Sequence, residues 1–93
     1  MEVDTNLLRS LRTHLEAAEA GGDANALEFY RHLVSYCTAR PGEDEDDVAT
    51  YIKLYEKCRA SLERTSATNP GRGCLLMMMG QITSEAKRKL QMP

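Results

Sequence analysis

The sequence predicts an all-α protein, a small antiparallel bundle of four helices in which a three-helix core is joined by a C-terminal helix. Apolar residues recur at spacings of three and four along most of the chain, which is typical of amphipathic helices. Glycine, proline and asparagine interrupt this pattern, and no alternating run enriched in β-branched residues indicates a strand. The 93 residues fit a single domain, 1–93. We expect helices at about 5–20, 24–39, 47–64 and 74–91.

The first expected helix runs from about Thr5 to Ala20. Asp4 or Thr5 can accept hydrogen bonds from the free amides of its first turn. Its apolar residues share one face, because they repeat every three or four positions: Leu8, Leu11, Leu15 and Ala18. Gly21 and Gly22 end the helix, since glycine tolerates the left-handed conformation of a C-cap.

The second expected helix runs from about Ala24 to Ala39, with Asp23 as its N-cap. Apolar side chains cover much of its circumference. A helix of this kind packs against more than one neighbour, so we expect it at the centre of the bundle. Pro41 and Gly42 follow its end.

An acidic run, residues 43–47, precedes the third expected helix. The helix dipole favours negative charge at this position, and Asp46 or Asp47 can supply the N-cap. The functional alternative is a docking patch for a basic partner or a weak cation site. The run lacks the glycine and the distal glutamate of an EF-hand loop.

The third expected helix, from about Asp47 to Arg64, has the clearest periodicity of the chain. Its apolar stripe consists of Val48, Tyr51, Ile52, Tyr55, Cys58 and Leu62. Leu54 lies off that stripe. Two pairs of opposite charge are three or four residues apart and are expected to interact: Lys53 with Glu56, and Arg59 with Glu63.

Residues 65–73 contain the residue types of a loop, and the fourth expected helix runs from about Cys74 to Gln91. One face of this helix is apolar: Leu75, Met79, Ile82, Ala86 and Leu90. Gly80 weakens the helix by about 1 kcal/mol relative to alanine. Three cations lie in the last turns, where the dipole favours them: Lys87, Arg88 and Lys89.

The run of three methionines at 77–79 is the strongest indication of an interaction surface. Consecutive helical residues point in three directions, so the three side chains cannot all lie in one buried seam. Methionine adapts to varied apolar partners, although it also fills gaps in a thin core. The candidate partner-binding residues are Leu75, Leu76, Met77, Met78 and Met79, with Lys87, Arg88 and Lys89 for an acidic counterpart.

Charge and composition exclude several classes of protein. Twelve basic and fourteen acidic residues give a net charge of −2, which is unlike the basic footprint of a nucleic-acid binder. The longest apolar run, 74–79, is far too short to span a bilayer. Three cysteines without regular spacing, and an N-terminus without signal-peptide character, favour a cytoplasmic location, with the nucleus as an option.

Catalytic and metal-binding motifs are missing from the sequence, so we expect no enzyme, no cofactor and no metal site. Cys74 lies at the expected start of a helix, two residues after Arg72, and both features would lower the pKa of a thiol. A reactive or redox-sensing thiol is therefore one hypothesis. The segment 71–73, Gly-Arg-Gly, could hold a phosphate at the same helix start, although a plain flexible loop is the better interpretation.

The stretch 20–30 contains Ala-Gly, four residues, Ala-Leu, two residues and Tyr. This spacing is similar to the helix-turn-helix pattern of microtubule-interacting and trafficking (MIT) domains and of tetratricopeptide hairpins. The resemblance covers residues 6 to about 37 and implies an antiparallel hairpin. MIT domains are three-helix bundles whose grooves bind short helical tails of the ESCRT membrane-remodelling machinery. The longer acidic loop and the fourth helix depart from that family.

Our leading hypothesis from the sequence is a non-catalytic interaction or adaptor module. It would bind a helical or extended protein segment through an inter-helix groove or through the methionine-rich helix. A structural subunit or obligate homo-oligomer of a larger assembly, viral or cytoskeletal among the options, is the first alternative. A redox- or anion-responsive regulator acting through Cys74 and Arg72 is the second.

Overall fold

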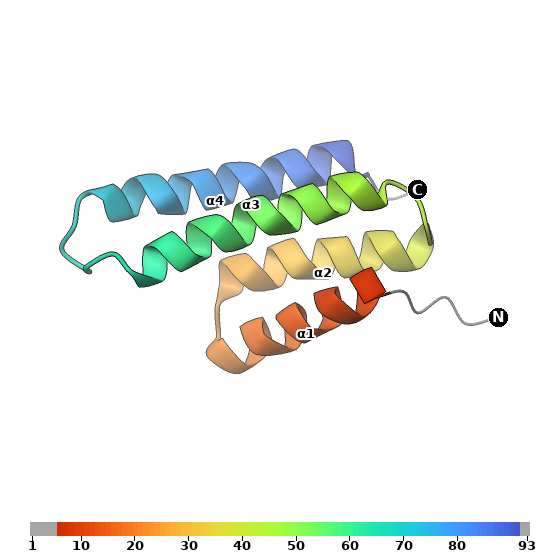
Figure 1. The fold of residues 1–93 in the computed structure, drawn as a ribbon, viewed down its shortest axis with the longest axis horizontal. Helices are drawn as coiled ribbons and strands as arrows, with labels where there is room; N and C mark the ends of the chain where they lie inside the picture. The colour runs from red at the N-terminus through yellow and green to blue at the C-terminus, as the bar shows by residue number, and fades with distance from the viewer. Residues whose placement is uncertain (1–5, 92–93) are drawn as a thin grey trace.

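The computed structural model describes residues 6–91, which form four α-helices and no strand (Figure 1). The helices are α1 (Asn6–Gly21), α2 (Ala24–Ala39), α3 (Glu45–Glu63) and α4 (Gly71–Lys89). Each helix runs antiparallel to the one before it (Figure 1). The predicted all-α fold, a small antiparallel bundle, is therefore confirmed.

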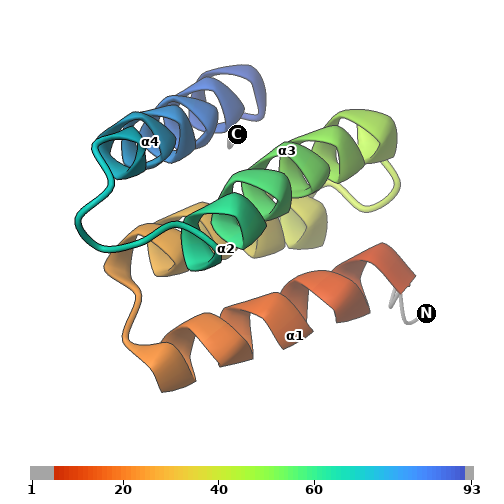
Figure 2. The same cartoon turned by 60° about the vertical axis from the view of Figure 1, so that its left-hand side comes forward.

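The bundle consists of two helical hairpins, α1–α2 and α3–α4, that pack against each other (Figure 2). α2 lies centrally, between α1 and the α3–α4 hairpin, as its apolar circumference predicts. The expected grouping was a three-helix core with an additional fourth helix. Two paired hairpins describe the contacts between the helices better. α4 is an integral part of the core and lies alongside α3, with Met79, Ala86 and Leu90 buried.

Aromatic side chains join the two hairpins at the centre of the core. Phe29 stacks on Tyr55, with ring centroids 4.2 Å apart and planes 10° from parallel. Tyr30 meets the edge of both rings, at 4.9 Å from Phe29 and 5.8 Å from Tyr55. Rings bury large apolar areas, so these contacts bridge α2 and α3 although the sequence offers no tryptophan and one phenylalanine.

The α1–α2 hairpin agrees closely with the sequence. α2 has the expected bounds, and the Asp23 carboxylate accepts a hydrogen bond from the backbone N–H of Ala26 at 3.2 Å. Gly22 adopts a positive φ of 67°, which makes the tight turn that ends α1 possible. The N-cap expected at Asp4 or Thr5 lies outside the described residues.

The start of α3 differs from the prediction. The helix begins at Glu45, and Asp44 is its N-cap in a left-handed conformation with φ 53°. The N-cap expected at Asp46 or Asp47 is therefore wrong, and both residues lie in the first helical turn, where the dipole favours their charge. The Asp44 carboxylate instead accepts a hydrogen bond from the Tyr36 hydroxyl, which ties α2 to the start of α3.

α4 starts earlier and ends earlier than expected. Gly71 opens the helix, because Pro70 before it has a φ of −63° and the Asn69 side chain accepts a hydrogen bond from the Gly71 N–H at 2.8 Å. The expected loop 65–73 is therefore shorter. At the other end, His32 Nε2 lies 2.7 Å from the carbonyl oxygen of Leu90, which attaches the C-cap to α2.

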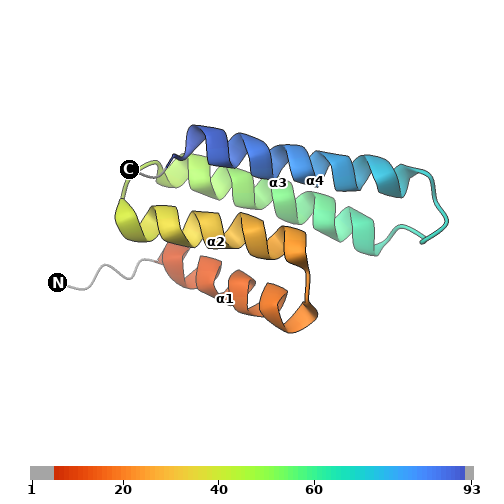
Figure 3. The same ribbon diagram turned by 180° about the vertical axis from the view of Figure 1, so that it is seen from behind.

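The α3–α4 hairpin extends beyond the α1–α2 hairpin at the end where α3 and α4 are connected (Figures 1 and 3). The first turns of α4 consequently have α3 as a neighbour but lie past the end of α2. This offset leaves part of an otherwise packed helix open to solvent.

Candidate interaction surface

An open groove with a volume of 360 Å³ lies between α3 and α4, and we call it the α3–α4 groove. Its apolar walls come from both helices: Leu54, Cys58, Leu75, Met78 and Ile82. Its polar lining consists of Lys57, Ser61 and Gln81. An apolar surface with a few polar groups around it is typical of sites that bind an apolar segment of another protein.

The exposed large hydrophobic side chains of residues 6–91 all belong to the α3–α4 hairpin. Their exposed fractions are 45% for Leu54, 43% for Leu76, 66% for Met77 and 48% for Met78. Covering apolar area is favourable by about 25 cal/mol per Å². The gathering of these side chains on one hairpin marks it as the surface that gains most from being covered.

The methionine run is divided between core and surface, as helical geometry requires. Met79 is 4% exposed and belongs to the core, whereas Met77 and Met78 are open to solvent. Met79 was among the candidate partner-binding residues, and its burial removes it from any surface contact of the folded chain. Leu75 is half-buried in the α3–α4 groove. Leu76 and Met77 are exposed but do not line this groove, and Met77 lines a separate hollow on α4.

The three basic residues at the end of α4 have carboxylates of the same chain beside them. Lys87 binds Glu28 of α2. Arg88 binds Glu85 at 2.5 Å, and Lys89 lies 3.9 Å from Asp47. The Lys87 and Lys89 contacts join α4 to α2 and α3, whereas Arg88 pairs within α4, so each of the three cations already has a carboxylate beside it.

The α3 side of the groove was missed from the sequence. Leu54 lies one residue before the buried Tyr55 and off the apolar stripe of its helix. A leucine outside the apolar stripe of its helix was the sequence feature that could have indicated this wall of the groove. The periodicity of one helix does not show which other helix packs beside Leu54, because that depends on the tertiary fold.

A basic border follows the same side of α3. Lys53, Lys57 and Arg64 are exposed, and four- and seven-residue spacings place them on one side of the helix. Among residues 6–91, no carboxylate lies within ion-pair distance of these three side chains. Of the two pairs expected on α3, Arg59 with Glu63 is confirmed at 3.8 Å, but Lys53 does not pair with Glu56.

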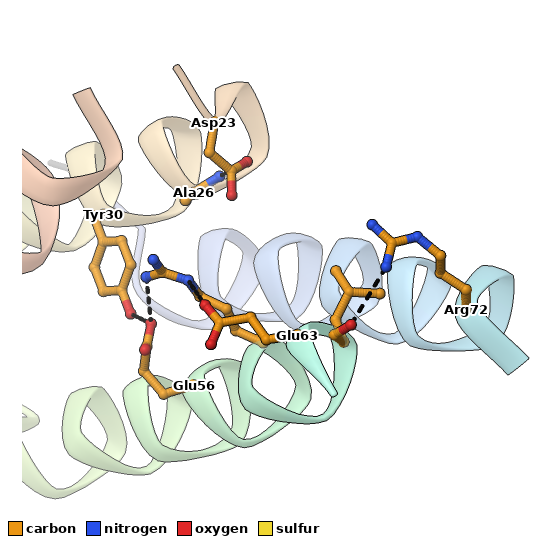
Figure 4. Close-up of polar contacts among 8 residues, drawn as sticks. Asp23, Ala26, Tyr30, Glu56, Glu63 and Arg72 are labelled. Atoms are coloured by element: carbon orange, nitrogen blue, oxygen red, sulfur yellow. Dashed lines mark hydrogen bonds and ion pairs between the residues drawn. The ribbon is translucent and has the colours of Figure 1, made fainter. Parts of the chain in front are cut away.

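Glu56 is turned toward α2 instead, where it accepts a hydrogen bond from the Tyr30 hydroxyl (Figure 4). Arg59 lies 3.6 Å from the same carboxylate. Burial, together with the hydrogen bond to Glu56, raises the pKa of Tyr30 well above its usual range. This phenol therefore stays protonated and attaches α2 to α3; it does not serve as an acid or a base near neutral pH.

Cys74 is exposed in the fourth position of α4, and Arg72 is its helical neighbour. The Arg72 guanidinium donates hydrogen bonds to the carbonyl oxygens of Leu62 at 3.3 Å and Thr65 at 3.5 Å (Figure 4 shows the first). Arg72 thus stabilises the C-terminal end of α3. The Gly71 N–H, which could bind a phosphate, already donates to the Asn69 side chain. The reactive thiol and the phosphate site stay predictions, with this structural role as the competing explanation.

The acidic run also has a structural explanation. Three of its carboxylates lie in the first turn of α3, and Glu43 forms an ion pair with Arg40 at 3.3 Å. Across residues 6–91, no group of three or more histidine, cysteine or acidic side chains is placed to hold a metal ion. Within the same residues, none of the helices has the length and apolar character needed to cross a bilayer.

Comparison with known proteins adds no further constraint. No protein-family model, no curated protein and no solved structure matches this chain. The structure contains the antiparallel α1–α2 hairpin that the resemblance to MIT and tetratricopeptide domains implies. Membership of either family stays a prediction.

Proposed function

We propose that this protein is a non-catalytic interaction module whose α3–α4 groove binds an apolar segment of a partner protein. The observation that carries the proposal is an open groove with apolar walls on one hairpin, where the exposed side chains of Leu54 on α3 and Met78 on α4 lie together. Surface hydrophobics scattered singly need no explanation, but apolar side chains that line one groove together are typical of binding surfaces.

The rest of the molecule supports a binding role over catalysis. The partly buried polar contacts, such as Tyr30 with Glu56 and Tyr36 with Asp44, each join two parts of the bundle. Burial and hydrogen bonding raise the pKa of these tyrosines, so they are poor proton donors and acceptors at neutral pH. A cytoplasmic or nuclear location fits three free cysteines.

The test is affinity purification with mass spectrometry, using the wild-type chain and two variants of the groove, Leu54→Asp and Met78→Asp. Both side chains are exposed, so we expect either variant to keep its helical circular dichroism and thermal midpoint. Ala17→Asp, on the exposed side of α1, is the matched control.

A protein retained by the wild type and the control, but lost with both groove variants, is the expected result. Retention that is equal for all four chains would contradict the proposal. A third variant, Leu76→Asp, guards against loss by unfolding, because Leu76 does not line the groove and should have a smaller effect.

A second copy of the chain is the alternative occupant that the same apolar face favours. Light scattering over a dilution series separates the two. A monomer whose mass is independent of concentration supports a foreign partner. A dimer that Met78→Asp dissociates would favour the structural, self-assembling role.

A further inference from the structure

The charges around the α3–α4 groove identify the kind of segment that it suits. We propose that the partner segment is an acidic amphipathic helix, with its apolar face in the groove and its carboxylates against Lys53 and Lys57. This inference rests on the function proposed above and deepens it.

The absence of a sheet in residues 6–91 favours a helical partner. An extended segment gains affinity by adding its backbone hydrogen bonds to a sheet edge, and an all-α hairpin offers no such edge. A helix satisfies its own backbone groups and needs only apolar contact. A third helix can pack its side chains into the apolar groove between two antiparallel helices.

The charge around the groove opposes the charge of the whole chain. The net charge is −2, yet the unpaired ionic side chains beside the groove are cations. Lys57 lines the groove itself, and Lys53 precedes it by one turn. Glu85, the carboxylate nearest on the α4 side, already binds Arg88.

Within the part of α3 that lines the groove, the carboxylates point away from these cations, and no carboxylate of residues 6–91 lies within ion-pair distance of them. Glu56 and Glu63 face the other side of the helix, where they contact Arg59 (Figure 4). A bound helix lying along α3 would meet Lys53 and Lys57 about 6 Å apart along its axis. Carboxylates at positions i and i+4 match that spacing.

The test is a phage-displayed library of peptides about 18 residues long, close to the 19 residues of α4. Each peptide carries a fixed helical stripe of leucine and methionine, and the flanking positions are random. Selection uses the wild-type chain, with Leu54→Asp for counter-selection. We expect aspartate and glutamate to be enriched at flanking positions four residues apart.

A charge swap then tests the contact directly by isothermal titration. Lys57→Glu should raise the Kd of an enriched peptide roughly three- to tenfold and flatten its salt dependence. A peptide with lysine in place of the facing glutamate should recover the loss. Arg31→Glu is the matched control, since Arg31 is an exposed cation on α2 and its reversal changes the net charge equally.

Each other outcome overturns the inference in a distinguishable way. Enriched peptides that depend on Leu54 but have neutral or basic flanks would contradict the acidic partner and leave the proposed function intact. A library without any peptide that depends on Leu54 would remove both. Binding to phosphatidylserine vesicles that Lys57→Glu abolishes, without peptide binding, would assign the basic border to a membrane surface.

Discussion

At the residue scale, two buried tyrosines have hydroxyl groups with opposite effects on stability. Tyr30 and Tyr55 are both fully buried. The Tyr30 hydroxyl donates to the Glu56 carboxylate, whereas the Tyr55 hydroxyl has no hydrogen-bond partner among residues 6–91. A buried polar group costs free energy when it lacks a partner and stabilises when it has one.

The two tyrosines therefore predict opposite effects of the same substitution. Tyr55→Phe should raise the free energy of unfolding by about 1 kcal/mol, because it removes a buried hydroxyl without a partner. Tyr30→Phe should lower the free energy of unfolding by about 1–2 kcal/mol, because Glu56 loses its donor. Urea unfolding at pH 7 measures both, and a Tyr55→Phe variant less stable than Tyr30→Phe would contradict this account.

Alkaline pH should unfold the bundle through the same residue type. The hydrogen bond to Asp44 raises the pKa of Tyr36 to about 12, and burial raises the pKa of Tyr55 to about 12. In the unfolded chain these phenols lose their protons near pH 10, so above that value the unfolded state binds fewer protons. Stability is thus fully present below about pH 10 and falls between about pH 10 and 12.

Urea unfolding at a series of pH values, with tyrosinate absorbance as the probe, measures this decline. Tyr36→Phe is the informative control, because it should lessen the decline. A stability that stays level from pH 9 to 12 would show that neither phenol is held protonated by the fold.

At the element scale, the sequence predicts every helix and most of the buried residues. It misplaces the start of α4, which Pro70 and the Asn69 side chain set three residues earlier through contacts local to the chain. It misses the left-handed Asp44 because the contact that holds its carboxylate comes from Tyr36 on α2. The methionine run was identified correctly as divided between core and surface, but its partner wall on α3 depends on helix pairing.

Two glycines provide a prediction about the elements that contain them. Gly80 lies inside α4 with open space where a Cβ would be, so Gly80→Ala should stabilise the protein by about 1 kcal/mol. Gly42, before α3, has a positive φ of 79° that side chains rarely adopt. Gly42→Ala should therefore destabilise by about 1–2 kcal/mol. Thermal unfolding decides the signs, and a stabilising Gly42→Ala would disprove the turn geometry.

For the whole molecule, the two hairpins are offset along the bundle, so the first turns of α4 lie past the end of α2 (Figure 3). α1–α2 and α3–α4 share a core of stacked rings, but α3–α4 projects past its partner hairpin (Figure 3). Helical geometry turns Met79 into the core and leaves Met77 and Met78 in solvent. The α3–α4 groove combines side chains of two helices, so the methionine run indicated its α4 wall, whereas its α3 wall depends on how the two helices pair.

The most direct measurement of this account is methyl NMR of the free protein with its methionines labelled and a soluble paramagnetic agent added. We predict strong attenuation of the Met77 and Met78 methyl signals and protection of Met79, at every protein concentration. Attenuation of Met79 would mean that α4 is not packed on the bundle. Protection of all three methyls at low concentration would mean that the proposed surface is already covered in the free chain.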